Sequence, residues 1–149
     1  MKEIIYLVSP LLVGILSSLF TKNASEVYSD LILPEFAPNG NVFPIVWAIL
    51  YVLMGLSAYL VYKNGEKTKT KALGFFAISL VANFLWSIIF FSLNNYILAF
   101  VWLIILLALI IYVTKLFYQE TKFAGLLLVP YVLWVIFAGI LNLYIICLN

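Results

Sequence analysis

Aromatic residues recur at helical spacing in three apolar stretches of this chain, and they are its best candidates for binding a ligand. Phe43, Trp47 and Tyr51 stand four residues apart, so they share one face of a helix. A flat, apolar molecule could stack on such a face. An aromatic belt at a membrane surface, combined with ordinary packing, explains the same pattern, so this stretch alone leaves both interpretations open.

Two further stretches combine aromatic rings with asparagine on one helix face. The residues that share these faces are Asn83, Trp86, Ser87 and Phe90 in one stretch, and Tyr131, Trp134, Ala138 and Asn142 in the other. The small side chain of Ala138 leaves space beside the indole. Hydrogen bonds between helices explain the asparagine at position 83 as well as ligand binding does, and they explain the one at position 142 better.

Most other chemistry is excluded by the residue types. The chain has no histidine, and the only charged side chain in its apolar stretches is Lys115, near the end of the fourth, which argues against a Ser-His-Asp triad and against a proton relay. Cys147 is the only cysteine, so we expect no metal site and no disulfide within the chain. Eight lysines without any arginine do not indicate nucleic-acid binding.

The composition is that of a membrane protein, since 66% of the residues are hydrophobic and 9% are charged. Five apolar stretches are long enough to cross a bilayer as helices. They cover residues 4–20, 42–62, 72–93, 96–117 and 123–148. We therefore predict one all-α domain, residues 1–149, built as a polytopic bundle of five transmembrane helices. No small-residue cleavage site follows the first stretch, which favours a helix over a signal peptide there.

Residues 21–41 form the longest connection and are expected to be a lid. Pro34, Pro38 and the pair Asn39-Gly40 supply its turn chemistry. Its middle, residues 25–33, is expected to form a short amphipathic turn. Three of its side chains are predicted to face the bundle: Tyr28, Leu31 and Ile32.

The lysines predict the orientation in the membrane. Seven of them fall on one side, in the N-terminus and in the loops near residues 63–71 and 118–122, whereas only Lys22 falls on the other. By the positive-inside rule, the N-terminus and these two loops are cytoplasmic. The lid loop 21–41 and the C-terminus are then outside, in what we expect to be a bacterial cytoplasmic membrane.

Three motifs in this order resemble the TspO/MBR family, whose members include the tryptophan-rich sensory and translocator proteins. The motifs are VF-x-x-VW-x-x-LY from residue 42, N-x-x-WS-x-x-FF from residue 83 and VPY-x-x-W-x-x-F-x-x-x-LN from residue 129. The resemblance covers nearly the whole chain. It implies a five-helix bundle, commonly a homodimer, with a pocket under the first loop. Porphyrins and benzodiazepine- or isoquinoline-type compounds are the ligands that it implies.

Carried onto this sequence, the resemblance implies seven pocket residues. They are Tyr28 from the loop, Trp47 and Tyr51, Asn83 and Trp86, and Trp134 and Ala138. Phe36 and Asn41 stand where many members have tryptophan, which thins the aromatic cover. The sterol-recognition pattern of animal members is incomplete near Tyr144, so we do not predict sterol binding.

The leading hypothesis is a receptor or sensor in which a porphyrin stacks on Trp47 and Trp134, with polar help from Tyr28 and Asn83. No cofactor is required, and a metal-free ring is favoured because no histidine can serve as an axial ligand. One alternative is light-dependent degradation of the porphyrin, with Trp47 and Trp134 as the reacting indoles. The other is a porphyrin transporter, which ranks last because no inverted repeat is visible.

Overall fold

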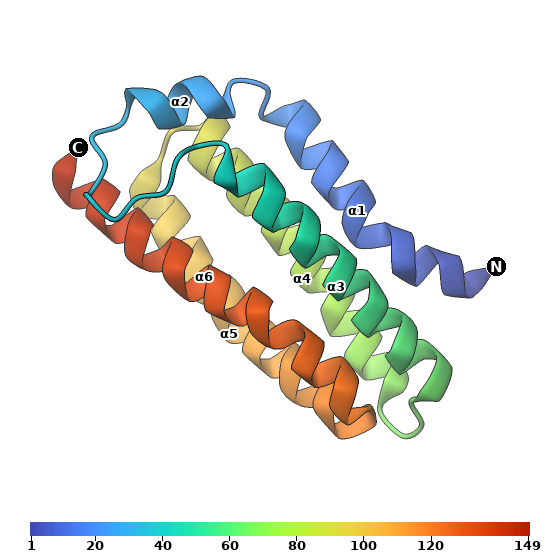
Figure 1. Ribbon diagram of the computed structural model, residues 1–149. Helices are drawn as coiled ribbons and strands as arrows, with labels where there is room; N and C mark the ends of the chain where they lie inside the picture. The colour runs from blue at the N-terminus through green and yellow to red at the C-terminus, as the bar shows by residue number, and fades with distance from the viewer.

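The computed structural model describes residues 1–149 and consists entirely of helices and their connections (Figure 1). Five helices are long and apolar enough to cross a membrane. They are α1 (Lys2–Phe20), α3 (Val42–Asn64), α4 (Lys69–Ser87) with its π-helical continuation η1 (Ile88–Ser92), α5 (Tyr96–Glu120) and α6 (Lys122–Leu148). The prediction of an all-α integral membrane protein with five transmembrane helices is therefore confirmed.

Helices α3 to α6 extend further at one end of the bundle than the apolar stretches predicted for them. The third predicted span, 72–93, starts at Lys69 in the structure, and the fourth, 96–117, continues to Glu120. A helix needs no apolar side chains once it leaves the bilayer, and long charged side chains reach water from its ends. The Glu120 carboxylate also ties these ends together, because it accepts the N–H groups of Glu66 at 2.7 Å and Thr68 at 2.8 Å.

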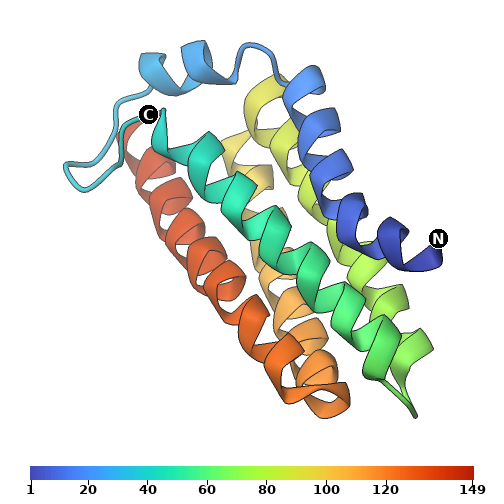
Figure 2. The ribbon, with the colours of Figure 1, turned by 45° about the vertical axis from the view of Figure 1, so that its right-hand side comes forward.

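The short helix α2 (Ala24–Asp30) lies across the other end of the bundle, as Figures 1 and 2 show. It is the amphipathic turn predicted for the first loop, and Tyr28 is buried beneath it as expected. Ile32, however, was predicted to face the bundle and is 61% exposed. The helix ends at Asp30 and Leu31 is extended, with φ −79° and ψ 146°, so helical periodicity no longer sets the direction of the Ile32 side chain.

Small residues let α1 approach α3 closely. A Cβ atom on Gly55 would lie 3.0 Å from the carbonyl carbon of Leu7, and one on Gly14 would lie 2.6 Å from the ring of Tyr51. On its other side, α3 is joined to α6 by the buried hydroxyl of Ser57, which donates to the Ala124 carbonyl at 2.6 Å. Close backbone contact and a buried hydrogen bond replace the hydrophobic effect as the source of helix association in lipid.

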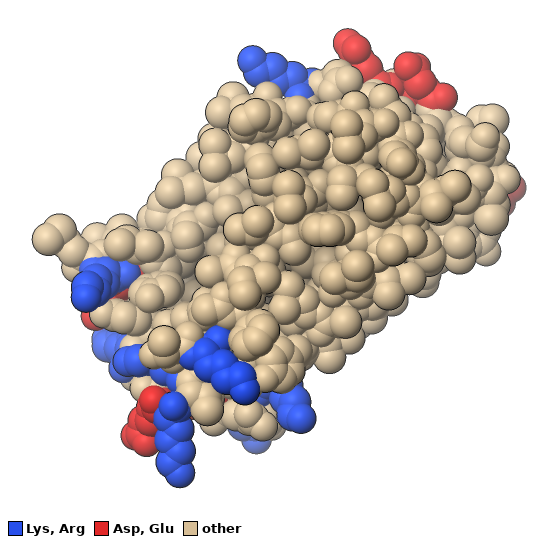
Figure 3. All heavy atoms as spheres, turned by 180° about the vertical axis from the view of Figure 1, so that it is seen from behind, with Lys and Arg blue, Asp and Glu red and all other residues tan.

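Charged side chains gather at the two ends of the molecule. Figure 3 shows several lysines with a few acidic residues at one end, acidic residues together with one lysine at the other, and an uncharged face between them. Many large apolar side chains on this middle region are exposed, including Ile104 and Leu133 at 52% and 60%. Such a surface suits contact with acyl chains.

Substituting Gly55 by alanine should destabilise the bundle, because the added methyl group would press on the rigid backbone of Leu7. We expect a loss of about 1–3 kcal/mol, the usual cost of overpacking. Gly74 lies in α4, and no atom lies within 4 Å of the position that an added methyl group would take, so Gly74→Ala is the matched control and should cost nothing. Thermal unfolding of both variants in one detergent tests this. Equal melting temperatures for the two variants would contradict the close contact between Gly55 and the Leu7 backbone.

Candidate functional site

A cavity of about 510 Å³ lies beneath α2, between α1, α3, α4 with η1, and α6. Its volume falls within the range of roughly 300–1,000 Å³ that is typical of small-molecule sites. Twenty-five residues line it, and none of them is a lysine, aspartate or glutamate. The cavity is thus suited to an uncharged ligand.

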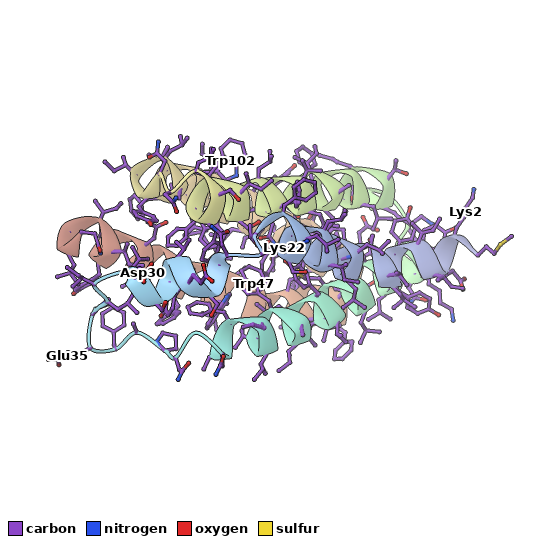
Figure 4. All side chains as sticks on the ribbon, turned by 90° about the horizontal axis from the view of Figure 1, so that it is seen from above. Lys2, Lys22, Asp30, Glu35, Trp47 and Trp102 are labelled. Atoms are coloured by element: carbon purple, nitrogen blue, oxygen red, sulfur yellow. The ribbon has the colours of Figure 1, made fainter.

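The structure brings six of the seven pocket residues inferred from the sequence to the wall of this cavity. They are Tyr28, Trp47, Tyr51, Asn83, Trp86 and Ala138. They come from four separate helices, so they meet only in the folded chain. Figure 4 places Trp47 between α2 and α3, under the lid, and Trp102 on the opposite side of the bundle.

Trp134 is the seventh, and it does not line this cavity. It lies in a shallow apolar groove between α3 and α6, and its ring centroid is 5.7 Å from that of Phe43 and 5.2 Å from that of Phe137. An α-helix has about 3.6 residues per turn, so residues spaced four apart do not point in the same direction. The side chains at positions 134, 138 and 142 therefore point in successively rotated directions around α6. Ala138 and Asn142 face the cavity, whereas Trp134 has rotated out behind Phe43. The two indoles on the cavity are therefore Trp47 and Trp86.

Tyr28 fastens the lid instead of presenting a free hydroxyl to the cavity. Its hydroxyl donates to the carbonyl of Pro38 at 2.7 Å, and its ring packs edge-on against Phe43 at 5.0 Å. Burial raises the pKa of the Tyr28 phenol, so the hydroxyl remains a protonated donor. From the sequence, we expected the Tyr28 hydroxyl to hydrogen-bond a ligand. In the structure, this hydroxyl makes its hydrogen bond within the lid.

Three buried hydrogen-bond donors at the cavity wall have no partner. They are the hydroxyl of Ser17, the side-chain N–H₂ of Asn83 and the indole N–H of Trp86. The Tyr51 hydroxyl lies close to both Ser17 and Asn83. A buried donor without an acceptor costs about 1–3 kcal/mol, so a ligand would recover that free energy if small side-chain rotations turned these donors toward its acceptors.

Helix η1 contributes Phe91, which helical spacing did not place on the cavity face. Its backbone has a bond from Leu93 N to Ile88 O at 3.0 Å, which is the i to i+5 pattern of a π-helix. The wider turn lets the consecutive residues Phe90 and Phe91 both line the cavity. The face drawn from the sequence included Phe90 alone, and no residue type in this stretch signals a π-helix.

Helix α1 supplies another part of the wall that the sequence did not assign to the site. Gly14 and Ser17 line the cavity. Their small size permits close helix packing, and it also leaves room for the cavity. Asn142, by contrast, links helices as predicted, because its side chain donates to the Tyr96 carbonyl at 3.0 Å.

Comparison with known proteins yields matches over almost the whole chain. The TspO/MBR family matches residues 6–148. The "Tryptophan-rich protein TspO" of Chlorobaculum tepidum is 39% identical over 142 residues, covering 93% of this chain and 90% of the relative. The protein of the same name from Archaeoglobus fulgidus is 34% identical over 150 residues, with 100% and 97% covered. The "Tryptophan-rich sensory protein" of Cereibacter sphaeroides is 33% identical over 124 residues, with 83% and 77% covered.

Removing the Tyr28 hydroxyl should loosen the lid while leaving the bundle intact. Tyr28→Phe deletes the bond to Pro38 but keeps the ring, so we expect local stability to fall by about 1 kcal/mol. Faster hydrogen exchange of the amides in α2 would report this loss. Tyr118→Phe is the matched control, because Tyr118 is exposed at the far end of α5. Unchanged exchange in α2 of the Tyr28→Phe protein would show that the bond does not hold the lid.

Proposed function

Because the chain belongs to the TspO/MBR family, we propose that it is a membrane receptor or sensor that binds a porphyrin-like tetrapyrrole in the cavity beneath α2. The observation that carries this proposal is a cavity of about 510 Å³ with aromatic walls and no charged lining residue. Benzodiazepine- and isoquinoline-type compounds would compete for the same space. The word "sensory" in the name of the Cereibacter sphaeroides relative is consistent with a receptor.

The wall chemistry favours a neutral ligand with hydrogen-bond acceptors. Ionised carboxylates would be costly to bury here, because no lysine lines the cavity. The outer face of the lid carries Lys22 against Glu26, Asp30 and Glu35, a balance of +1 and −3 that repels anions. The unpartnered donors of Ser17, Asn83 and Trp86 suit the nitrogen or carbonyl acceptors of an uncharged ring.

Packing beneath the cavity supports a receptor over a transporter. Met54 is buried in α3 about one turn beyond the wall residue Tyr51, and Leu106 of α5 is fully buried in the same core. Gly14 of α1 closes directly onto the ring of Tyr51. A transporter would need a second opening through this packed region.

Light-dependent degradation of the bound porphyrin is the second candidate. The position of Trp86 at the cavity wall favours it. This indole and that of Trp47 both border the cavity, whereas Trp134 lies behind Phe43. Any photochemical role therefore belongs to Trp47 and Trp86. Illumination of the complex with and without dioxygen tests this. If the Trp47→Phe, Trp86→Phe double variant lost porphyrin as fast as the unaltered protein, the loss would be ordinary photobleaching and not an enzymatic reaction.

The orientation and assembly of the chain form part of the proposal. We expect the lysine-rich end to be cytoplasmic, which places α2 and the cavity mouth on the outer side of a bacterial cytoplasmic membrane. We also expect a homodimer, as the family implies. Both expectations are open to direct tests, by labelling of single cysteines from each side and by mass measurement in lipid nanodiscs.

Porphyrin titration in nanodiscs is the principal test. A dimethyl ester should bind more tightly than the free diacid at neutral pH, because only the diacid carries carboxylates. Trp47→Phe should weaken binding by about 0.5–1.5 kcal/mol, the usual contribution of an aromatic pair. Trp102→Phe should leave affinity unchanged, because the Trp102 indole donates to the Ala82 carbonyl at 2.8 Å on the far side of α4.

The proposal would fail if the diacid bound as tightly as the ester and Trp47→Phe and Trp102→Phe had equal effects. A hydrophobic dye of similar size serves as the control ligand. Binding of the dye with the same affinity would indicate nonspecific partitioning.

Replacing Asn83 by leucine tests the donors at the cavity wall. Leucine keeps the volume but removes the N–H₂ group that has no partner. A ligand with acceptors should lose about 1–2 kcal/mol of binding free energy, whereas the protein alone should become no less stable. Isothermal titration and thermal unfolding measure the two effects separately. Unchanged affinity would mean that ligand acceptors do not reach this wall.

A further inference from the structure

The side chain of Asn149 joins the end of α6 to the first loop. Its Oδ1 accepts the N–H of Ile32 at 3.0 Å, and its Nδ2 donates to the Ile32 carbonyl at 2.9 Å. The same Nδ2 donates to the Ile145 carbonyl at 2.9 Å, which fixes the amide on the helix. A side-chain amide thus pairs with a single residue through both a donor and an acceptor, as a residue of a neighbouring strand would.

This pair is the only hydrogen-bonded link between residues 31–38 and a transmembrane helix. Packing reinforces it, because the ring of Phe36 lies edge-on to Tyr144 at 5.1 Å and to Phe137 at 6.3 Å. Figure 1 shows the end of α6 beside the loop that leads from α2 to α3. All these contacts attach the loop to the same helix, α6.

The loop and α2 are coupled to each other. Tyr28 of α2 donates to the carbonyl of Pro38, so α2 and the segment that follows it are tied at 2.7 Å. An interaction that holds Ile32 in place therefore also holds α2, the helix that covers the cavity. Since both Ile32 and Asn149 are exposed, water competes for these hydrogen bonds, which keeps each of them weak.

We propose that Asn149 is a latch that holds α2 and the loop closed over the cavity, and that its release admits molecules from the aqueous side. The inference goes beyond the proposed function, because it concerns access to the cavity and not the identity of the ligand. A carboxamide supplies a donor and an acceptor on two atoms in one plane, which matches the N–H and C=O groups of a single residue. Asn149→Asp keeps the acceptor alone, and Asn149→Ala removes both.

Access can be measured without any ligand. Ala138 lines the cavity and Cys147 is exposed, so Ala138→Cys in a Cys147→Ser background places the one thiol under the lid. A cationic methanethiosulfonate reagent enters from water and not through lipid. In nanodiscs, we expect Asn149→Ala to raise its reaction rate roughly three- to tenfold, the effect of losing two solvent-exposed hydrogen bonds. Asn149→Asp should give a smaller rise.

Asn64→Ala is the matched control, because Asn64 ends α3 at the opposite end of the bundle. It should leave the rate unchanged, and thermal unfolding should show that all variants remain folded. A rate that does not change in Asn149→Ala, or that rises equally in Asn64→Ala, would overturn the latch. The reagent is not the porphyrin, so failure of porphyrin binding would leave this result intact, and loss of the latch would leave the binding proposal intact.

Discussion

Every peptide group of a membrane-spanning segment must find its hydrogen bond within the protein, since the bilayer core offers no water. This chain meets the constraint almost entirely within its helices, which contain 96 of its 110 backbone hydrogen bonds. The side chains are then left to decide how the helices associate. Close contacts at Gly14 and Gly55, and the hydroxyl of Ser57 on α6, bring the helices together without a charged residue in the interior.

The same constraint applies to the polar side chains at the cavity wall, which also need hydrogen-bond partners within the protein. Polar side chains that join helices elsewhere donate to backbone carbonyls, as Asn142 does to Tyr96 and Trp102 does to Ala82. The buried donors of Ser17, Asn83 and Trp86 at the cavity have no such partner, and those of Thr121, Tyr131 and Trp134 outside the cavity have none either. Unpaired donors reduce the stability of a protein, and the three at the cavity belong to a wall that also encloses a ligand-sized space of about 510 Å³.

The lid shows a different balance of forces. Its inner contacts are strong, because Tyr28 is buried and bonded to Pro38, whereas its outer contacts with α6 are few and exposed to water. A cover built in this way keeps its shape while its edge can detach. Thermal opening of such an edge needs no rearrangement of the transmembrane helices.

The sequence by itself determined the membrane class, the number of helices and most of the candidate site. Uncharged runs of sufficient length leave a chain in lipid no alternative to helices, and periodicity places residues such as Trp47 and Tyr51 on one face. Those signals are local, so they could be read without the fold. The family resemblance added Tyr28 from the loop and joined the separate helix faces into one site, which periodicity alone could not do.

Only the tertiary structure decided which faces meet. Trp134 was assigned to the cavity, but the rotation of α6 carries it behind Phe43. The π-turn of η1 adds Phe91, and the Asn149 amide meets Ile32 from 117 positions away in the chain. These outcomes depend on helix rotation, on a change of helical pitch and on long-range pairing. Periodicity describes one helix at a time, and therefore it contains none of this information.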